Sequence, residues 1–301
     1  MTSRCPHQGP LGNPPRALFV LRLFAWCSAF LLSPSPELIW GGEEVRERPL
    51  ESVTVSPPTP LPIVGERLSF HGRWFGIPVG YGWIEVKGVV DLEGQPAYHI
   101  EAQGHSNDVL STFYPIHDEI HSYVDVNTLR PIRFEKHQRE GHYRADEVVT
   151  FDYTRSIATY RSLLNQSVKE IALPPDVLDL IGALYWFRAQ PIGSETAMRL
   201  NLYTDEKIYH TEIQIKRPIL LELLKRGTFS CLVVEPKASF KGLLVKRGRL
   251  WAYLTADEHR LPLLIKITTP WGPMSAVIDE TSLPPTLQMR ESDAGRRPAG
   301  P

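Results

Sequence analysis

The chain has 301 residues, of which 42% are hydrophobic and 22% are charged, and its formal net charge is −1. These shares are ordinary for a globular protein, so most of the chain is expected to bury a core. The 33 basic residues are balanced by 34 acidic ones, which excludes the strongly basic face that general nucleic-acid binding needs.

The N-terminal segment, residues 1–42, has the pattern of a signal peptide. Arg16 and Arg22 precede the apolar run Leu23–Leu32, which stops at Pro34. Ten apolar residues lie within the range of a signal-peptide core and fall short of the roughly 20 that a spanning helix requires. The segment therefore predicts export, with a retained amphiphilic anchor as the alternative.

Cysteine usage predicts stability from packing alone. Cys5 and Cys27 lie in the leader, so cleavage leaves only Cys231. One thiol forms neither an internal disulfide nor a zinc cluster. Cys231 lies in an apolar run and is expected to be a small buried residue.

The chain divides into four segments by composition. After the signal-peptide region come a proline-rich spacer at 43–63, a β-rich domain at 64–283 and a disordered tail at 284–301. Period-2 alternation recurs through the domain, most clearly in Ile208–Lys216. Strands with short connections predict a mainly β, single-domain antiparallel curved sheet or half-open barrel.

One segment is predicted to be helical. Val177–Arg188 is apolar on nearly every side, and Asp176 precedes it as a potential N-cap. A helix without a polar face cannot lie half-exposed on a surface. We therefore expect it to pack in the concave side of the sheet, with Leu184 nearly inaccessible.

A glycine-rich segment resembles a dinucleotide-binding motif but lacks its context. Gly76-Ile77-Pro78-Val79-Gly80-Tyr81-Gly82 matches G-x-x-x-G-x-G. That motif needs a helix opening after it, so that backbone amides point at phosphate. Here Trp83-Ile84-Glu85-Val86-Lys87 continues as a strand. The segment predicts a glycine-containing hairpin and no nucleotide cofactor.

The histidine pair His117 and His121 is spaced for zinc binding on a helix, but Ile116–Val126 alternates as a strand. Two residues four positions apart on a strand are separated by roughly 13 Å and cannot chelate one ion. The sequence therefore predicts no metal site. It also has no G-x-S-x-G, P-loop or C-x-x-C motif, and no catalytic residue or cofactor is predicted.

Two surface hypotheses remain. The basic stretch Lys237–Arg249 has an apolar centre and is either a solvated hairpin or a loop that contacts anionic lipid. The membrane-contact residues expected in it are Phe240, Leu243, Lys246 and Arg247. The aromatics expected to contact an apolar ligand, with core packing as the alternative, are Trp74, Tyr81, Trp83, Tyr185 and Trp251.

A series of short motifs resembles one bacterial family, the domain of unknown function 3108, across nearly all of residues 64–283. In chain order they are Gly65-Glu66-Arg67-Leu68; Gly76-Ile77-Pro78-Val79-Gly80; Ser122-Tyr123-Val124-Asp125 with Leu129-Arg130-Pro131; Val149-Thr150-Phe151-Asp152; Asp176-Val177-Leu178 with Leu184-Tyr185-Trp186-Phe187-Arg188; and Gly248-Arg249-Leu250-Trp251 with Asp257 and Arg260-Leu261-Pro262. The resemblance implies an exported envelope protein with a curved sheet, similar to the half-barrels that carry lipoproteins in the periplasm. It brings no activity and no site residues.

The functional expectation that follows is an exported protein of the periplasm or of the periplasmic face of the outer membrane. The favoured hypothesis is a non-enzymatic binder or carrier of an apolar ligand such as a lipid, with the membrane surface as a further partner. A glycan-acting enzyme is an alternative because such enzymes need only two suitably placed carboxylates. A structural or assembly partner in the envelope is the other alternative, and the oligomeric state is left open.

Overall fold

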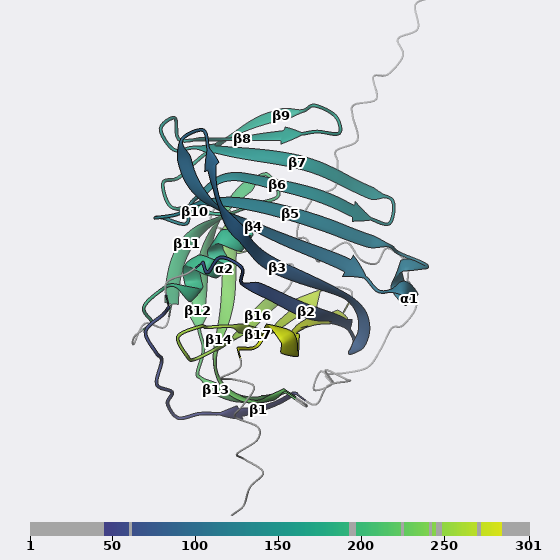
Figure 1. Ribbon diagram of the computed structural model, residues 1–301, viewed down its shortest axis with the longest axis vertical. Helices are drawn as coiled ribbons and strands as arrows, with labels where there is room; N and C mark the ends of the chain where they lie inside the picture. Colours follow the sequence, from purple (N-terminus) through teal and green to yellow (C-terminus); the bar gives the residue numbers. More distant parts are fainter. Residues whose placement is uncertain are drawn as a thin grey trace, which may run out of the picture.

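The computed structural model describes residues 45–59, 62–192, 197–223, 226–240, 243–244, 249–269 and 272–284. The described part is mainly β-structure (Figure 1). Its elements are β1 Val45–Pro49, β2 Arg67–Trp74, β3 Ile77–Leu92, β4 Gln95–Ser106, α1 Asp108–Ser111, β5 Ile116–Asp125, β6 Pro131–Glu140, β7 Tyr143–Asp152, β8 Ile157–Ser162, β9 Val168–Ala172, β10 Val177–Leu178, α2 Leu180–Arg188, β11 Ala197–Thr204, β12 Lys207–Ile215, β13 Ile219–Leu223, β14 Gly227–Phe240, β15 Leu243–Leu244, β16 Arg249–Thr255, β17 Pro262–Thr269, β18 Gly272–Ile278 and the 3₁₀ turn η1 Glu280–Ser282.

The strands form one continuous sheet. Pairing runs from β9 back through β8, β7, β6, β5, β4 and β3 to β2, and then through β18, β17 and β16 to β14. The long strand β14 branches the sheet, because its first half pairs with β13 and its second half with β12. β13 continues to β1, and β12 continues to β11 and β10. Every pairing among the described strands is antiparallel except that of β10 with β11.

The sheet curls into an open barrel. Side-chain contacts, and not backbone hydrogen bonds, connect its margins. Two of its margins, β9 and β10, are consecutive in the chain. Tyr203 on β11 meets the ring of Phe151 on β7 at 5.3 Å. Lys136 on β6 lies 3.5 Å from Asp205 in the β11–β12 turn and 2.9 Å from Glu147. The predicted half-open barrel is thereby confirmed.

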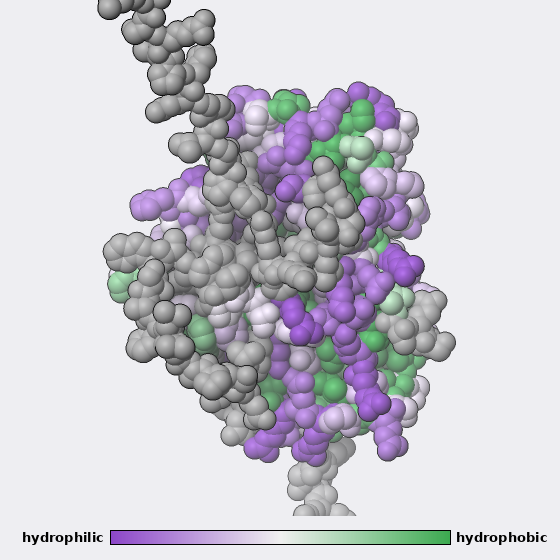
Figure 2. Space-filling model, turned by 180° about the vertical axis from the view of Figure 1, so that it is seen from behind, coloured by the Kyte–Doolittle hydropathy of each residue, from purple (hydrophilic) through white to green (hydrophobic). Residues whose placement is uncertain are grey.

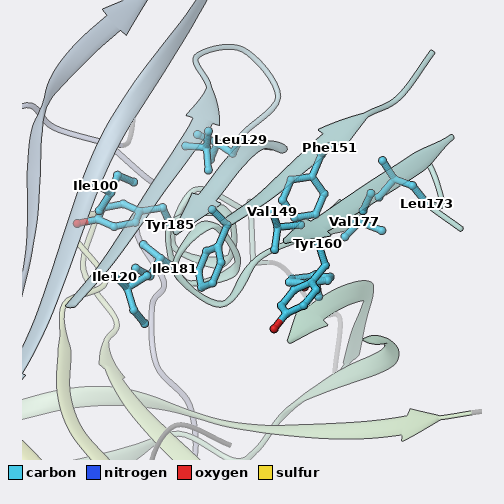
Figure 3. Close-up of a cluster of buried hydrophobic side chains, with 14 of the residues drawn as sticks. Ile100, Ile120, Leu129, Val149, Phe151, Tyr160, Leu173, Val177, Ile181 and Tyr185 are labelled. Atoms are coloured by element: carbon cyan, nitrogen blue, oxygen red, sulfur yellow. The ribbon is translucent and has the colours of Figure 1, made fainter. Parts of the chain in front are cut away.

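Helix α2 lies inside the curve of this sheet. Ile181 and Tyr185 belong to a buried cluster with side chains of β3 to β8, among them Ile100 and Ile120 (Figure 3). Phe187, on another side of the helix, packs in a second cluster with residues of β11, β12, β14 and β16. The helix is therefore held between the two arms of the sheet, as expected for an apolar helix with no solvent face.

The helix is shorter than the sequence pattern predicts. Val177 and Leu178 form β10, which pairs with β11, so the helix begins at Leu180 and its N-cap is Asp179 instead of Asp176. The prediction for Leu184 was also wrong: this side chain is only partly buried, whereas Tyr185 is completely buried.

Two buried arginines fix the C-terminal end of α2. Arg188 donates to both carboxylate oxygens of Glu66, each at 2.7 Å, and also to the backbone carbonyl of His259. Arg260 donates to the carbonyls of Arg188 and Gln190, beyond the last turn of the helix. A guanidinium group near a helix C-terminus satisfies carbonyls that have no intrahelical partner.

Part of the segment predicted to be a proline-rich spacer belongs to the sheet. Its residues Val45–Pro49 form β1, which pairs along its whole length with β13. Glu47 accepts hydrogen bonds from Tyr253 and Lys266. The segment continues along the barrel, where the amide of Ser56 bonds to the carbonyl of Ala256. Long-range pairing therefore places this segment in the fold.

Seen from behind, the molecule presents hydrophilic and hydrophobic side chains intermixed on its described surface (Figure 2). Neither α1 nor α2 has the length and apolar character that a membrane-spanning helix requires, in the part of the chain that the structure describes. The signal-peptide region and the residues after Pro284 lie outside the described residues.

We predict that Glu66→Ala destabilises the protein by about 3–5 kcal/mol, because it leaves the fully buried Arg188 without its counter-charge. Glu85→Ala is the matched control. It removes the partner of a half-exposed Arg67, and such a pair contributes about 0–1 kcal/mol. Urea unfolding of both variants measures the difference. Equal losses in the two variants would contradict this account of α2.

Candidate functional site

The outer face of β3 to β6 carries a dense array of histidine, aromatic and acidic side chains. Along β3, Ile84 and Val86 pack inward against the core, so the alternate residues Tyr81, Trp83 and Glu85 face outward. Cross-strand register brings the outward residues of the other strands beside them. They are His99, Glu101, Gln103 and His105 on β4, His117, Glu119, His121 and Tyr123 on β5, and Glu135, His137 and Arg139 on β6.

At one end of this array, three aromatic rings are stacked. The rings of Tyr81 and Trp83 lie against His105 with centroids 5.2 and 5.1 Å away. The guanidinium of Arg67 covers Trp83 at 4.4 Å. Tyr81 is half-exposed. The stack is a preformed surface that offers an aromatic face and polar groups together.

Two histidine pairs bridge β4 and β5. His99 Nε2 lies 2.9 Å from His121 Nδ1, and His105 Nδ1 lies 3.1 Å from His117 Nδ1. Burial, together with the neighbouring histidine, lowers the pKa of both His99 and His105. These two rings are therefore held in their neutral form over a wider pH range than an exposed histidine.

Four aspartates, Asp125, Asp152, Asp257 and Asp279, are engaged in turns. Asp125 and Asp152 each accept backbone N–H groups two and three residues ahead, as does Asp257. Asp279 accepts the amide of Thr281 and lies 2.6 Å from His71 Nε2. Such Asx turns stabilise loops, so these four carboxylates have a structural role in this fold.

Asp118, unlike the four aspartates in turns, lies within a strand. It lies on the inner face of β5, is almost fully buried, and accepts the amide of Arg139 on β6 at 2.9 Å. Burial raises the pKa of Asp118, while hydrogen bonds from Arg139, Glu140 and Gln138 oppose that rise. The described residues contain no group of three or more histidine, cysteine, aspartate or glutamate side chains arranged to hold a metal ion.

A second surface feature is an apolar rim at the α1 end of the sheet. The β2–β3 turn and α1 lie together there, because Asn107 donates from its side chain to the carbonyl of Pro78. The exposed fractions of the rim side chains are 83% for Phe113, 73% for Val109, 62% for Ile77 and 51% for Phe75. Four large apolar side chains this exposed are uncommon at one end of a soluble domain.

The five aromatics predicted to contact a ligand do not line one pocket. Tyr81 and Trp83 share the outer stack, whereas Tyr185 lies on α2 inside the curve and is fully buried. Trp251 on β16 packs under Arg249. Trp74 lies beside Phe75 at the rim, with ring centroids 5.2 Å apart.

Two of the four predicted membrane-contact residues lie outside the described residues. Lys246 and Arg247 are not described, and for Phe240 and Leu243 the structure gives only their backbone pairing with each other. The adjoining ends of β14 and β16 lie at the same end of the sheet as the apolar rim, since Arg249 pairs with Thr268 next to the β17–β18 turn.

Sequence reasoning missed both the histidine pairs and the apolar rim. Each histidine pair joins residues on different strands, and only the register of β4 with β5 brings them together. The one available signal was the outward alternation of His99, Glu101, Gln103 and His105. The rim residues Val109 and Phe113 read in sequence as ordinary apolar positions.

Comparison with known proteins places the chain by family and by fold. The family model described as protein of unknown function (DUF3108) matches residues 69–279. A solved structure, a β-barrel-like protein of domain of unknown function DUF1849 from Brucella abortus, is similar with a TM-score of 0.50 and 6% identity. The similarity covers 71% of this chain and 94% of that one. No curated protein sequence matches. At 6% identity the structural likeness concerns the fold alone.

We predict opposite pH responses for two buried or half-buried acids. The raised pKa of Asp118 means that the folded state binds its proton more tightly, so stability falls as pH rises from about 4 through the raised pKa. Asp118→Asn should remove that fall.

The pKa of Asp279 is lowered to about 2, chiefly by the Thr281 hydroxyl. Its contribution is present above pH 4 and is lost toward pH 2, so Asp279→Asn should destabilise only above that range. Unfolding free energies from pH 2 to 8 test both signs.

Proposed function

This chain belongs to the family of proteins of unknown function DUF3108, and from its own surface we propose that it is a non-enzymatic, exported envelope protein that binds lipid at the apolar rim. The observation that carries the proposal is the exposure of Phe75, Ile77, Val109 and Phe113 at one end of the sheet. Burying one such side chain fully in an apolar phase is favourable by about 1.5–3 kcal/mol.

The proposal puts lipid at the rim because the concave side is already occupied. Ile181 and Tyr185 of α2 fill the space against β4 and β5 and are nearly inaccessible to solvent (Figure 3). An acyl chain in the same place would have to displace the helix and break the ion pair between Arg188 and Glu66. A ligand at the rim requires no such change.

The rim is held rigidly, which favours a contact surface over a mobile loop. Asn107 caps α1 by accepting the amide of Leu110, and its backbone amide bonds to the carbonyl of Val79 on β3. The ring of Phe75 packs over Gly272, where a Cβ atom would overlap it. Side chains positioned in advance lose less conformational entropy when they insert into a membrane interface.

Charge in the sequence supports an anionic lipid surface. The basic stretch Lys237–Arg249 contains five positive residues and no acidic one. β14 ends and β16 begins at the same end of the sheet as the rim, and β17 and β18 separate β16 from β2. Each basic residue near an anionic membrane contributes about 1 kcal/mol. The expected signal peptide would bring the protein into the compartment where such a membrane is available.

We predict that the protein floats with vesicles of phosphatidylethanolamine and phosphatidylglycerol, and that Ile77→Ser combined with Phe113→Ser weakens this binding at least about tenfold. The loss follows from removing two apolar side chains from the interface, since about 1.4 kcal/mol corresponds to a factor of ten. Flotation over a range of lipid concentrations measures it.

Val89→Ser is the matched control, because Val89 is 53% exposed but lies toward the β3–β4 turn, at the opposite end of the sheet. It should leave vesicle binding unchanged. Circular dichroism should show that all variants remain folded. The proposal fails if the unmutated protein does not bind, or if the control and the rim variant bind alike.

Export is tested separately. Residues 1–60 fused to a reporter that is active only outside the cytoplasm should give activity, because Leu23–Leu32 with its preceding arginines is expected to act as a signal-peptide core. Replacing Leu23 and Leu31 by arginine should abolish that activity by interrupting the apolar run. An intact fusion protein with an inactive reporter would overturn the export prediction.

A further inference from the structure

We propose that the two histidine pairs on the outer face, His99 with His121 and His105 with His117, each bind a divalent transition-metal ion such as Zn²⁺ or Cu²⁺. This inference is independent of the lipid proposal, since the pairs lie on the strand surface and not among the four apolar residues of the rim. It rests on the nitrogen positions, on the partners of the remaining ring nitrogens, and on the neighbouring carboxylates.

The nitrogen separations suit chelation. The facing nitrogens are 2.9 Å apart in the first pair and 3.1 Å apart in the second. With metal–nitrogen bonds of about 2.0–2.1 Å, these separations correspond to a nitrogen–metal–nitrogen angle of about 90–100°. That angle lies between square-planar and tetrahedral coordination, and imidazole suits copper and zinc.

The first pair has the outer partner that metal-binding histidines commonly use. His121 Nε2 lies 2.7 Å from a carboxylate oxygen of Glu119, so this nitrogen carries the proton and donates it. The lone pair of His121 is then on Nδ1, which faces His99. A carboxylate in this position orients the ring and raises its basicity as a ligand. Binding requires that neutral His99 move its proton from Nε2 to Nδ1 and that both rings turn, so that the two nitrogens, which now face each other along a hydrogen bond, converge on the ion.

The second pair is built in the same way with an amide in place of the carboxylate. The side-chain amide nitrogen of Gln103 donates to Glu101, which turns its oxygen toward His105. His105 Nε2 therefore donates to Gln103, and its Nδ1 lone pair faces His117. In both pairs, one histidine is fixed in the tautomer whose free nitrogen points at the other.

Strand register and neighbouring rings keep the two histidines of each pair side by side. His105 and His117 are directly opposite in the register of β4 and β5. The ring of His99 stacks on Tyr123 with centroids 4.6 Å apart, and that of His105 stacks on Trp83. Ligands on strands with packed side chains lose little entropy on binding.

Carboxylates lie beside the first pair, although Lys87 pairs with Glu101 and Arg133 pairs with Glu135. His121 is opposite Glu101 on β4 and opposite Glu135 on β6. These carboxylates favour a dication on this face of the sheet. Because each pair supplies two protein ligands, water completes the coordination, and such an open site exchanges its ion readily. The site is therefore suited to acquiring or passing on a metal.

Titration of tag-free protein with ZnCl₂ by isothermal calorimetry tests the proposal. Two ions should bind per chain. His99→Ala with His121→Ala should leave one, and adding His105→Ala with His117→Ala should leave none. His142→Ala is the control, because this exposed histidine lies in the β6–β7 turn and belongs to neither pair. It should leave both ions bound.

Two further measurements separate metal ligation from a structural role. Glu119→Gln keeps both histidines of the first pair and should weaken that site about tenfold or more. Electron paramagnetic resonance of the Cu²⁺-loaded protein should show nitrogen hyperfine coupling that disappears in the four-histidine variant. Absence of binding by the unmutated protein, or unchanged binding in the folded four-histidine variant, would overturn the proposal.

Discussion

The buried contact between Arg188 and Glu66 is the constraint on which the arrangement of this molecule depends. A guanidinium group without solvent access is tolerated only when its charge and its N–H groups are satisfied, and here both oxygens of one carboxylate and the carbonyl of His259 satisfy them. Since Glu66 precedes β2 and Arg188 ends α2, this contact ties the helix to the far side of the sheet. The curve of the sheet, in turn, determines which faces remain for function.

The two faces of the sheet therefore differ in the residues that they carry and in how these residues are packed. Inward side chains pack against α2 in a buried core that includes Tyr185. Outward side chains on β3 to β6 need no packing partner, and they carry the histidines and acids. Strand alternation is what lets the same ten-residue segment, β5, contribute Ile120 to the core and His121 to the surface.

The short motifs that carry the resemblance in the sequence are largely structural in this fold. Glu66 holds Arg188, Ser122 donates to the N-cap residue Asp179, and Asp257 orders the turn that carries Arg260. The resemblance at these positions therefore indicates a barrel built around the helix. These positions do not indicate what the surface binds. The resemblance therefore predicts a fold and brings no activity with it.

The sequence alone determined the strand-rich class, the glycine hairpin, the apolar helix and its place in the concave side, because alternation, turn residues and apolar periodicity are local properties of the chain. It did not determine that Val177 and Leu178 pair with β11, that Val45–Pro49 pairs with β13, or that His99 meets His121. Each of these contacts joins residues on different strands. Only the register of a curved sheet decides which strands are neighbours, and a one-residue shift would send every one of these side chains to the other face.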